Sequence, residues 1–249
     1  MKKYVIFSHM SAFRERLNRS LFVLAALLAA GGVWFGWKVW SAYGDIRAKG
    51  PEAVAQERAV AAWARRFGAS PRMKAEGLAT LPFLGSSTAT IRLVEFVDYG
   101  CPFCRDASGP LRRAVARQNG EIFLQLRDFP VPDLHPQAPD AAFAAQCVWR
   151  QGDSRRFWSY HDMLFATQGQ HAPEFLRTRA GRLGVDLVAY DACIAARVPE
   201  ADIQASVDAG IGLGIRGTPT FFLNGVMVEG VVSESDWDAA FQAARAASL

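Results

Sequence analysis

Two apolar segments in the middle of the chain have the pattern of buried strands. Residues 91–98 (IRLVEFVD) form a compact run rich in β-forming residues, and residues 121–128 (EIFLQLRD) alternate between apolar and polar positions. A helix is expected between them, from about Cys101 to Gln118, because the first strand ends at Tyr99-Gly100. Residues 137–215 then have an alanine-rich and aromatic pattern, interrupted only by single glycines and a proline, which predicts a series of helices.

The last part of the chain predicts a hairpin and a closing helix. The sequence Asn224-Gly225 separates the apolar runs TFFL and VMV, and this dipeptide favours the tight turn of a β-hairpin. A helix is expected from about Glu234 to Ala247. The order strand, helix, strand, helical insert, hairpin, helix predicts an α/β sandwich around a small central sheet.

The N-terminal region has a different pattern. Residues 1–20 carry five basic side chains and one acidic one, and the next seventeen residues, 21–37, contain no charge. Because this run is flanked by Lys38 and ends in tryptophans, we expect a transmembrane signal anchor over residues 21–40. The basic tip, residues 1–20, is then cytoplasmic, and the residues after 43 lie across the membrane.

Two alternatives to an uncleaved anchor are weaker. A cleaved signal peptide requires a shorter apolar run with small residues at its end, whereas this run ends in Trp34, Phe35 and Trp37. A soluble buried helix would carry polar residues at helical spacing.

The pair Gly32 and Gly36 is compatible with packing of two such helices, so a homodimer is a possibility. Residues 41–80 are interpreted as a partly helical stalk, with a helix predicted over residues 51–67.

Composition and charge limit the class of function. The 249 residues are 51% hydrophobic, which excludes a disordered chain, and four cysteines are too few for a disulfide-dense mini-protein. The formal net charge of +4 comes entirely from residues 1–20, so the rest of the chain is neutral. A nucleic-acid-binding surface is therefore not expected.

The strongest chemical signal is Cys101-Pro102-Phe103-Cys104, where a predicted strand meets a predicted helix. The start of a helix concentrates unpaired N–H groups and the positive end of the helix dipole, which stabilise a thiolate. We expect Cys101 to be the exposed attacking sulfur and Cys104 the shielded resolving sulfur. A zinc site would need two further ligands at comparable spacing, which the histidines and other cysteines do not supply. A purely structural short-loop disulfide is the other alternative.

The remaining cysteines, Cys147 and Cys193, lie on separate predicted helices of the insert. If residues 41–249 are outside the cytoplasm, the compartment is oxidising and two free buried thiols would be unusual. We therefore predict a structural disulfide between them, with two unpaired core cysteines as the alternative.

Four spaced motifs together resemble the DsbA-like thiol–disulfide oxidoreductases of the thioredoxin superfamily. They are VEFVDYGCPFCR (94–105), RDFPV (127–131), FWSYHDMLF (157–165) and GIRGTPTFFLNG (214–225). The resemblance runs from about residue 80 to the C-terminus. It implies a thioredoxin fold over residues 81–249, with a helical insert at about 135–215.

The resemblance also implies roles for further residues. Thr218-Pro219 would be a cis-proline loop opposite the dithiol, in which the backbone of Thr218 pairs with an extended substrate segment. Pro102 and Phe103 would also contact the substrate. Glu95 would be a buried acid that transfers protons to and from Cys104. The lysine that pairs with this acid in the best-known relatives is missing, so the pairing is either lost or taken by an arginine such as Arg127.

Two further features of the sequence are expected to have lesser roles. Asp98 either shares the proton transfer or caps the end of the strand. His161 and Asp162 resemble a catalytic pair, but adjacent helical residues are not expected to face each other.

The sequence thus predicts a thiol–disulfide oxidoreductase of the bacterial inner membrane, single-pass, with its catalytic domain in the periplasm. It would need no cofactor, because the dithiol is the redox centre. Its partners would be exported proteins with thiols or disulfides and a membrane redox partner that resets the dithiol. Oxidation is the first choice of direction, and reduction or isomerisation the second. A thiol protein that handles Cu(I) and a non-catalytic interaction module are alternatives from other classes.

Overall fold

Five short apolar segments pair into one mixed sheet. In the computed structural model, which describes residues 27–75 and 80–247, the strands are β1 (Phe83–Leu84), β2 (Ile91–Val97), β3 (Ile122–Asp128), β4 (Thr220–Leu223) and β5 (Val226–Glu229). Their order is β1-β3-β2-β4-β5. Strands β2 and β3 are parallel and the other pairs are antiparallel. Because helices cover both faces, β2 and β3 are buried along nearly their whole length.

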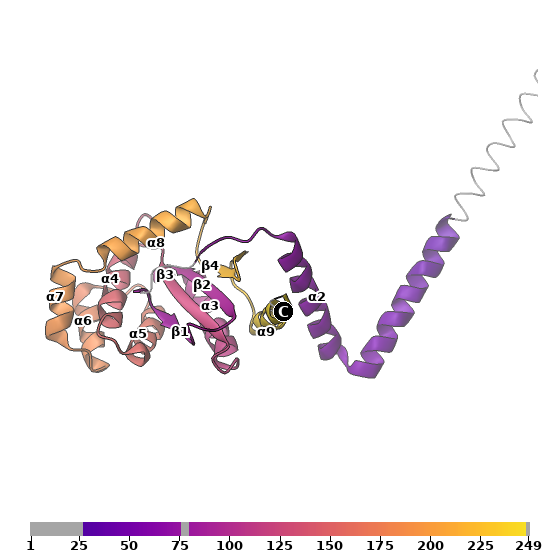
Figure 1. Cartoon of the computed structure of the whole chain (residues 1–249), viewed down its shortest axis with the longest axis horizontal. Coiled ribbons are helices and arrows are strands. Elements are labelled where there is room, and N and C mark those ends of the chain that lie inside the picture. The colour runs from indigo at the N-terminus through magenta and orange to yellow at the C-terminus, as the bar shows by residue number, and fades with distance from the viewer. Residues whose placement is uncertain (1–26, 76–79, 248–249) are drawn as a thin grey trace, which may run out of the picture. The chain divides into compact units, whose positions relative to one another are not determined.

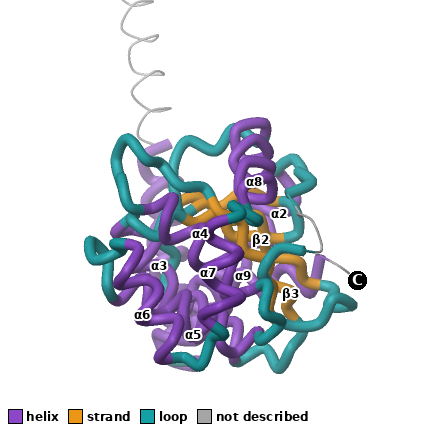
Figure 2. The backbone as a smooth tube through the Cα atoms, turned by 90° about the vertical axis from the view of Figure 1, so that its left-hand side faces the viewer, coloured by secondary structure: helices purple, strands orange, loops and turns teal. Residues whose placement is uncertain are grey.

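Helices pack on both faces of this sheet (Figure 1). Helices α3 (Pro102–Ala116) and α9 (Glu234–Ala247) contact each other on one face, and α8 (Glu200–Gly212) lies against the other. The insert between β3 and β4 also contains α4 (Ala138–Trp149), α5 (Ser154–Ala166), α6 (Pro173–Arg182) and α7 (Leu187–Ala195). Figure 2 shows the strands enclosed by these helices. The predicted α/β architecture is therefore confirmed, and it is thioredoxin-like.

The hairpin forms at Asn224-Gly225, as the sequence predicts. Both residues have positive φ, 45° and 81°, which is the backbone conformation of a type I′ turn. Only glycine fits at position 225, because a Cβ there would lie 2.7 Å from the carbonyl oxygen of Met73. The Met73 N–H in turn donates to the carbonyl of Gly225, so the segment before the first strand is fixed against the hairpin.

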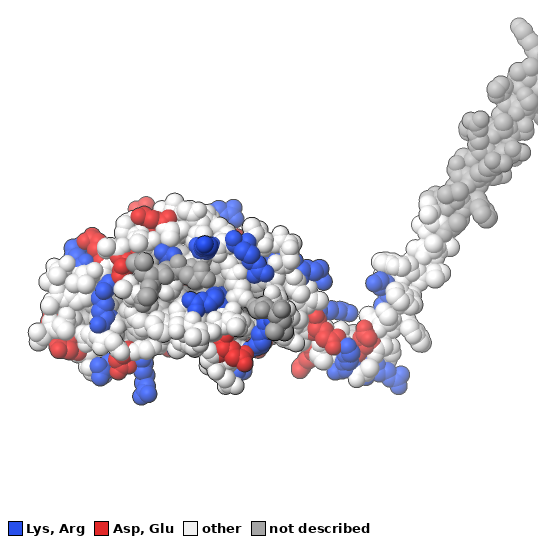
Figure 3. Space-filling model, in the orientation of Figure 1, with Lys and Arg blue, Asp and Glu red and all other residues white. Residues whose placement is uncertain are grey.

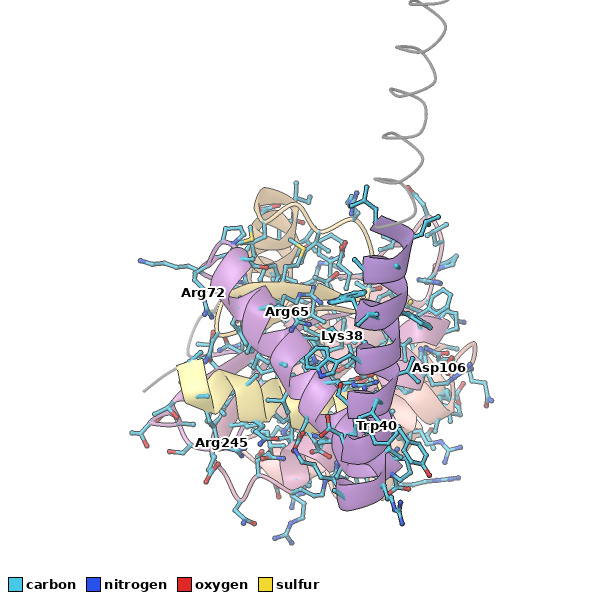
Figure 4. The ribbon with its side chains drawn as sticks, turned by 90° about the vertical axis from the view of Figure 1, so that its right-hand side faces the viewer. Lys38, Trp40, Arg65, Arg72, Asp106 and Arg245 are labelled. Atoms are coloured by element: carbon cyan, nitrogen blue, oxygen red, sulfur yellow. A yellow bond between two sulfur atoms is a disulfide. The ribbon has the colours of Figure 1, made fainter. Side chains whose placement is uncertain are left out.

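The chain divides into two compact units, Met1–Gln56 and Glu57–Leu249, so that α2 (Pro51–Ala69) spans the division. The part of α2 in the second unit is built into the domain that contains the sheet. Trp63 and Phe67 belong to its main hydrophobic core, and Arg66 donates to the carbonyl of Met227 at 2.7 Å. Figure 4 shows α2, with Arg65 on the helix and Arg72 just beyond its end. Residues within the segment interpreted as a stalk therefore stabilise the domain that follows it.

In the first unit, residues 27–49 are helical. Within residues 27–75 and 80–247, no helix combines the length and the apolar character needed to cross a bilayer. Residues 21–26 of the predicted anchor, and the whole basic tip, lie outside the described residues. The described part of the anchor carries highly exposed aromatic side chains at Trp34, Phe35, Trp37 and Trp40.

Acidic and basic side chains are interspersed on the face of the second unit shown in Figure 3. Several of them form ion pairs that join elements. Arg113 of α3 and Arg117, the residue that caps the end of α3, both bind Glu234 at the start of α9, the first at 2.6 Å. These contacts fix the two helices that cover one face of the sheet. The mixture of signs agrees with the neutral charge of this part of the sequence.

Candidate functional site: a dithiol beside a cis-proline

The dithiol lies where β2 leads into α3. Cys101 is the N-cap residue of α3 and Pro102 is at its first turn, where the missing N–H of proline is not needed. The sulfur-bearing residues are both buried, Cys101 5% exposed and Cys104 0%, whereas the Phe103 side chain between them is 62% exposed. Both cysteines are free thiols. The expectation that Cys101 is exposed is therefore wrong, because the chain packs over both sulfurs, although Cys104 is the more deeply buried of the two.

The loop before β4 closes over Cys101. The Thr218-Pro219 peptide bond is cis, and the Cys101 thiol donates to the carbonyl of Thr218 at 3.2 Å. The carbonyl of Pro219 accepts from the N–H of Gly230 at 3.0 Å, which joins this loop to the end of the hairpin. The fold thus brings together two segments that are 117 residues apart in sequence.

The pKa values of the two thiols at the site are shifted in opposite directions. A hydrogen bond from the Cys104 thiol is the main cause that lowers the pKa of Cys101 to about 5, and the Thr218 side chain and the N–H groups of Cys104 and Phe103 add to it. Burial raises the pKa of Cys104 well above its ordinary value. At neutral pH Cys101 is therefore a thiolate, able to act as nucleophile and leaving group, while Cys104 keeps its proton.

Asp98 shapes the loop before Cys101. Its buried carboxylate accepts hydrogen bonds from the N–H of Gly100 at 2.7 Å and the N–H of Val131 at 2.8 Å, and it contacts His135 Nδ1 at 2.9 Å. Glycine is required at position 100, because a Cβ there would lie 2.4 Å from the Cβ of His135. Of the two roles considered from the sequence, the geometry matches the capping of the strand end. Beside this loop lies a pocket of about 410 Å³, lined in part by Gly100, His135 and His171.

Gln168 is a site residue that the sequence analysis missed. Its side-chain amide donates to the carbonyls of Tyr99, at 3.0 Å, and Cys101, at 2.8 Å. Both acceptors belong to the turn that carries the nucleophile, so Gln168 holds that turn from the loop between α5 and α6. A single glutamine in a loop has no sequence pattern that would distinguish it.

Glu95 lies on β2, on the face of the sheet covered by α3. It is 1% exposed, and within the described part of the chain its Oε1 atom has no hydrogen-bond partner. Burial raises its pKa to about 7, and the charge of Arg112 opposes this rise. A carboxyl group that titrates near neutral pH is suited to exchange a proton with a nearby thiol.

The suggestion that Arg127 pairs with Glu95 is wrong. In the parallel ladder Arg127 is level with Phe96, and both project to the face opposite Glu95, because successive strand residues alternate. Arg127 instead donates to the carbonyls of Ala75 and Ala205, each at 3.1 Å. The cation whose charge acts on Glu95 is Arg112, on the helix of the dithiol itself.

The expectation for His161 and Asp162 is also wrong. Although they are neighbours on α5, His161 Nδ1 lies 2.9 Å from Asp162 Oδ1. Burial lowers the pKa of His161, so this imidazole is neutral at physiological pH and donates to the carboxylate. Asp162 contacts the buried His161 and lies 3.9 Å from Nε of Arg112, while 54% of its side chain remains exposed.

Cys147 and Cys193 form a disulfide with a Cα–Cα distance of 5.8 Å. It joins α4 to α7 within the helical insert. The fold thus separates the cysteines into one closed pair in the insert and one free pair at the site. Among the described residues, no group of three or more His, Cys, Asp or Glu side chains is arranged to hold a metal ion.

Comparisons with known proteins agree with this geometry. A family model described as Thioredoxin matches residues 78–243. A thioredoxin-like oxidoreductase from Silicibacter pomeroyi DSS-3 has a similar structure, with a TM-score of 0.60, 28% identity, and coverage of 68% of this chain and 94% of that one. The thiol-disulfide exchange protein alpha-DsbA2 from Wolbachia pipientis shares the fold, with a TM-score of 0.60, 18% identity, and coverage of 78% and 96%.

One curated protein that matches this chain is named as a transporter rather than as an oxidoreductase. The Na(+)/H(+) antiporter NhaA 1 of Salinispora arenicola (strain CNS-205) is 37% identical over 141 residues, which are 57% of this chain and 21% of that protein. The chain thus spans only about a fifth of the length of this relative. Since the family model covers most of the chain and the dithiol, the cis-proline and the sheet are all in place, the chain belongs to the thioredoxin family.

Proposed function

We propose that this thiol–disulfide oxidoreductase oxidises pairs of cysteines in exported proteins. The observation that supports this direction is the stabilised thiolate of Cys101, whose pKa is lowered to about 5. The thiolate exists only in the reduced enzyme, so every contact that stabilises it favours the reduced form. A dithiol with a stabilised reduced form is a strong oxidant, because it readily gives its disulfide to a substrate.

The reaction begins with a disulfide between Cys101 and Cys104. A substrate thiolate attacks the Cys101 sulfur, a substrate–Cys101 disulfide forms, and the Cys104 thiolate leaves and takes a proton from Glu95. A second substrate thiolate then attacks the substrate sulfur of this mixed disulfide and releases Cys101 as a thiolate. Two electrons pass from the substrate to the enzyme, and the substrate gains one disulfide.

Substrate recognition is proposed to use the surface around Cys101. Phe103 offers an exposed ring, and the Thr218 backbone lies beside the nucleophile, where an extended segment can add as a strand. After each turnover the dithiol must be reoxidised, so a membrane redox partner that accepts two electrons is part of the proposal.

We also infer that the chain is anchored in the inner membrane by residues 21–40, with residues 41–249 in the periplasm. The uncharged run after a basic tip supports this, as do the exposed aromatic residues of the helix at 27–49. A disulfide between Cys147 and Cys193 is consistent with an oxidising compartment.

The first test is the redox equilibrium of Cys101–Cys104 against glutathione in the full chain. A potential near roughly −120 mV is expected for an oxidase, whereas a value of roughly −200 mV or below would assign the chain to reduction or isomerisation. The Cys101→Ser variant is the control, since it should lose exchange entirely. Full activity in that variant would instead favour a non-catalytic interaction module.

A further inference from the structure

The pocket beside the dithiol loop has no part in the exchange steps proposed above. It has a volume of about 410 Å³, and its lining includes Gly100, the residue directly before Cys101. Phe103 and Thr218, which supply the proposed substrate contacts, do not line it. Adjacent Cα atoms of a chain are about 3.8 Å apart, so a residue next to a substrate cysteine bound at Cys101 comes within reach of the pocket.

One wall of the pocket is the loop before α4, which is tied to the dithiol loop. His135 Nδ1 lies 2.9 Å from Oδ2 of the buried Asp98, and Oδ1 of the same carboxylate accepts from the N–H of Gly100 at 2.7 Å. His135 also packs directly on Gly100, since a Cβ at that glycine would lie 2.4 Å from the Cβ of His135. These contacts fix the position of the His135 ring beside the nucleophile.

The opposite wall is the loop between α5 and α6, which contributes Gly169 and His171 to the lining. The N–H of His171 donates to Gln137 Oε1 at 3.0 Å, which joins this loop to the start of α4. Gln168 donates to the carbonyl of Cys101 at 2.8 Å, which joins the same loop to the dithiol. All the walls are thus held in place by hydrogen bonds, and a pocket that is already formed binds a ligand at a lower cost in entropy.

The polar side chains of the lining offer both acceptors and donors. The carboxylate of Asp98 can only accept, so His135 Nδ1 carries the hydrogen and Nε2 keeps a lone pair. His171 Nε2 donates to the carbonyl of Leu164 at 2.8 Å, which leaves Nδ1 as an acceptor. Burial lowers the pKa of His171, so this imidazole is neutral. Among the described residues only the oxygen of the Gln137 amide is engaged, and its nitrogen adds a donor.

We propose that this pocket is a substrate subsite for a neutral side chain that both donates and accepts hydrogen bonds, such as asparagine, glutamine, serine or threonine. Such a side chain can donate to the free nitrogen of His135 or His171 and accept from Gln137. A carboxylate would instead face two acceptors with the charge of Asp98 behind one of them, and an aliphatic side chain would leave these groups unpaired. The subsite binds the residue that flanks the substrate cysteine, so this inference rests on the proposed function.

The test uses peptides that differ only in the residue before or after their single cysteine, which is asparagine, its isostere leucine, or aspartate. The rate at which the oxidised full chain forms a mixed disulfide with each peptide is measured at pH 8. Each rate is divided by the rate of the same peptide with oxidised glutathione, which removes differences in thiol reactivity. On one side of the cysteine, the asparagine peptide is expected to react about fivefold faster than the leucine peptide, and the aspartate peptide slowest.

Variants of the lining show whether the pocket causes this preference. His135→Phe keeps a ring but removes the acceptor, so the ratio of the asparagine and leucine rates should fall to about one. His135→Gln restores a carbonyl acceptor and should recover part of the preference. The matched control is Asp133→Asn, an exposed position of the same loop outside the lining, which should keep the wild-type ratio. Because each result is a ratio, effects common to all substrates cancel.

A second measurement needs no turnover. The Cys104→Ala full chain, with histidine labelled by ¹⁵N, is joined to each peptide when the Cys101 thiolate attacks the peptide sulfur and displaces nitrothiobenzoate from it. The asparagine peptide should shift a ring-nitrogen signal of His135 or His171, because a lone pair there accepts a hydrogen bond, and the leucine peptide should not. The same complex made with His135→Phe identifies the signals of His135.

Equal rates for the asparagine and leucine peptides in the wild type, or an unchanged ratio in His135→Phe, would overturn the subsite. If His135→Phe does not fold, the wild-type ratio and the ring-nitrogen shifts still decide, and equal shifts with both peptides would count against it. If the oxidised chain reacted with none of the peptides, the proposed function would fail, while a shift specific to asparagine would still support the subsite.

Discussion

Single residues decide the chemistry of the dithiol. Cys101 and Cys104 belong to one motif, yet hydrogen bonds, chiefly the one from the Cys104 thiol, lower the pKa of Cys101, whereas burial raises the pKa of Cys104. The site therefore presents one thiolate and one thiol at neutral pH. The pKa of Glu95 is raised to about 7, chiefly by burial, which suits the proton transfer proposed for it.

The acidity of Cys101 can be measured directly. In the reduced full chain, the ultraviolet absorbance of the thiolate should appear with a midpoint near pH 5. Cys104→Ala should move this midpoint upward, because the hydrogen bond from Cys104 is the largest cause of the low pKa. A wild-type midpoint in the ordinary range of cysteine would contradict the account of the nucleophile.

Glu95 should make the stability of the protein depend on pH. Its pKa is raised from 4.5 to about 7 in the folded chain. Its contribution to the free energy of unfolding is therefore fully present below pH 4.5 and is lost as the pH rises through 7. The loss amounts to roughly 3 kcal/mol at alkaline pH. Glu95→Gln is therefore expected to raise stability at pH 8 relative to wild type, and much less at pH 5.

Urea unfolding at several pH values checks this expectation. Asp128, whose pKa burial also raises to about 7, adds a slope of the same sign, so Glu95→Gln should flatten the pH dependence without abolishing it. The exposed Glu174→Gln serves as the control and should leave the slope as in wild type. A steeper loss of stability in Glu95→Gln at alkaline pH would contradict the assignment.

At the scale of elements, a disulfide joins two helices within the insert, and a hydrogen bond joins the insert to the turn that carries Cys101. The disulfide joins α4 to α7, and the side chain of Gln168, just beyond α5, reaches the carbonyl of Cys101. The two connections are separate, because the disulfide joins α4 to α7, whereas Gln168 lies in the loop between α5 and α6. Stability of the insert and positioning of the nucleophile are thus divided between different elements.

Removing the disulfide should therefore affect stability more than exchange. The double variant Cys147→Ala/Cys193→Ala loses a cross-link over 46 residues, and its free energy of unfolding is expected to fall by about 2–4 kcal/mol. The rate of exchange at Cys101 should stay within about twofold of wild type, a change of less than 1 kcal/mol in the barrier. Urea unfolding under non-reducing conditions measures the first quantity, and unchanged stability would contradict the prediction.

The molecule as a whole combines a neutral catalytic domain with a basic N-terminal tip. If residues 21–40 anchor the chain, the full chain should remain with membranes after alkaline washing, and a chain that begins at residue 51 should be released. The shorter chain keeps Trp63 and Phe67, so its domain should retain the core that these residues complete. Release of the full chain by alkaline washing would contradict the anchor.

The sequence by itself determined the features that are encoded locally. Hydrophobic periodicity predicted every strand except the two-residue β1, and it predicted the helical insert. The spacing of Cys101 and Cys104 at a strand end predicted the candidate dithiol. Asn224-Gly225 predicted the hairpin, because the turn depends only on the backbone preferences of adjacent residues. The resemblance in four motifs supplied Thr218-Pro219 and Glu95.

Only the tertiary structure decided which distant side chains meet. The sequence suggested Arg127 as an example of an arginine that could pair with Glu95, whereas strand alternation turns Arg127 to the other face of the sheet, and the cation whose charge acts on Glu95 is Arg112. Gln168 reaches Cys101 because the loop after α5 folds back over the site. Such contacts depend on how faces of helices and strands pack, and a linear pattern carries no information about the partner on the other side.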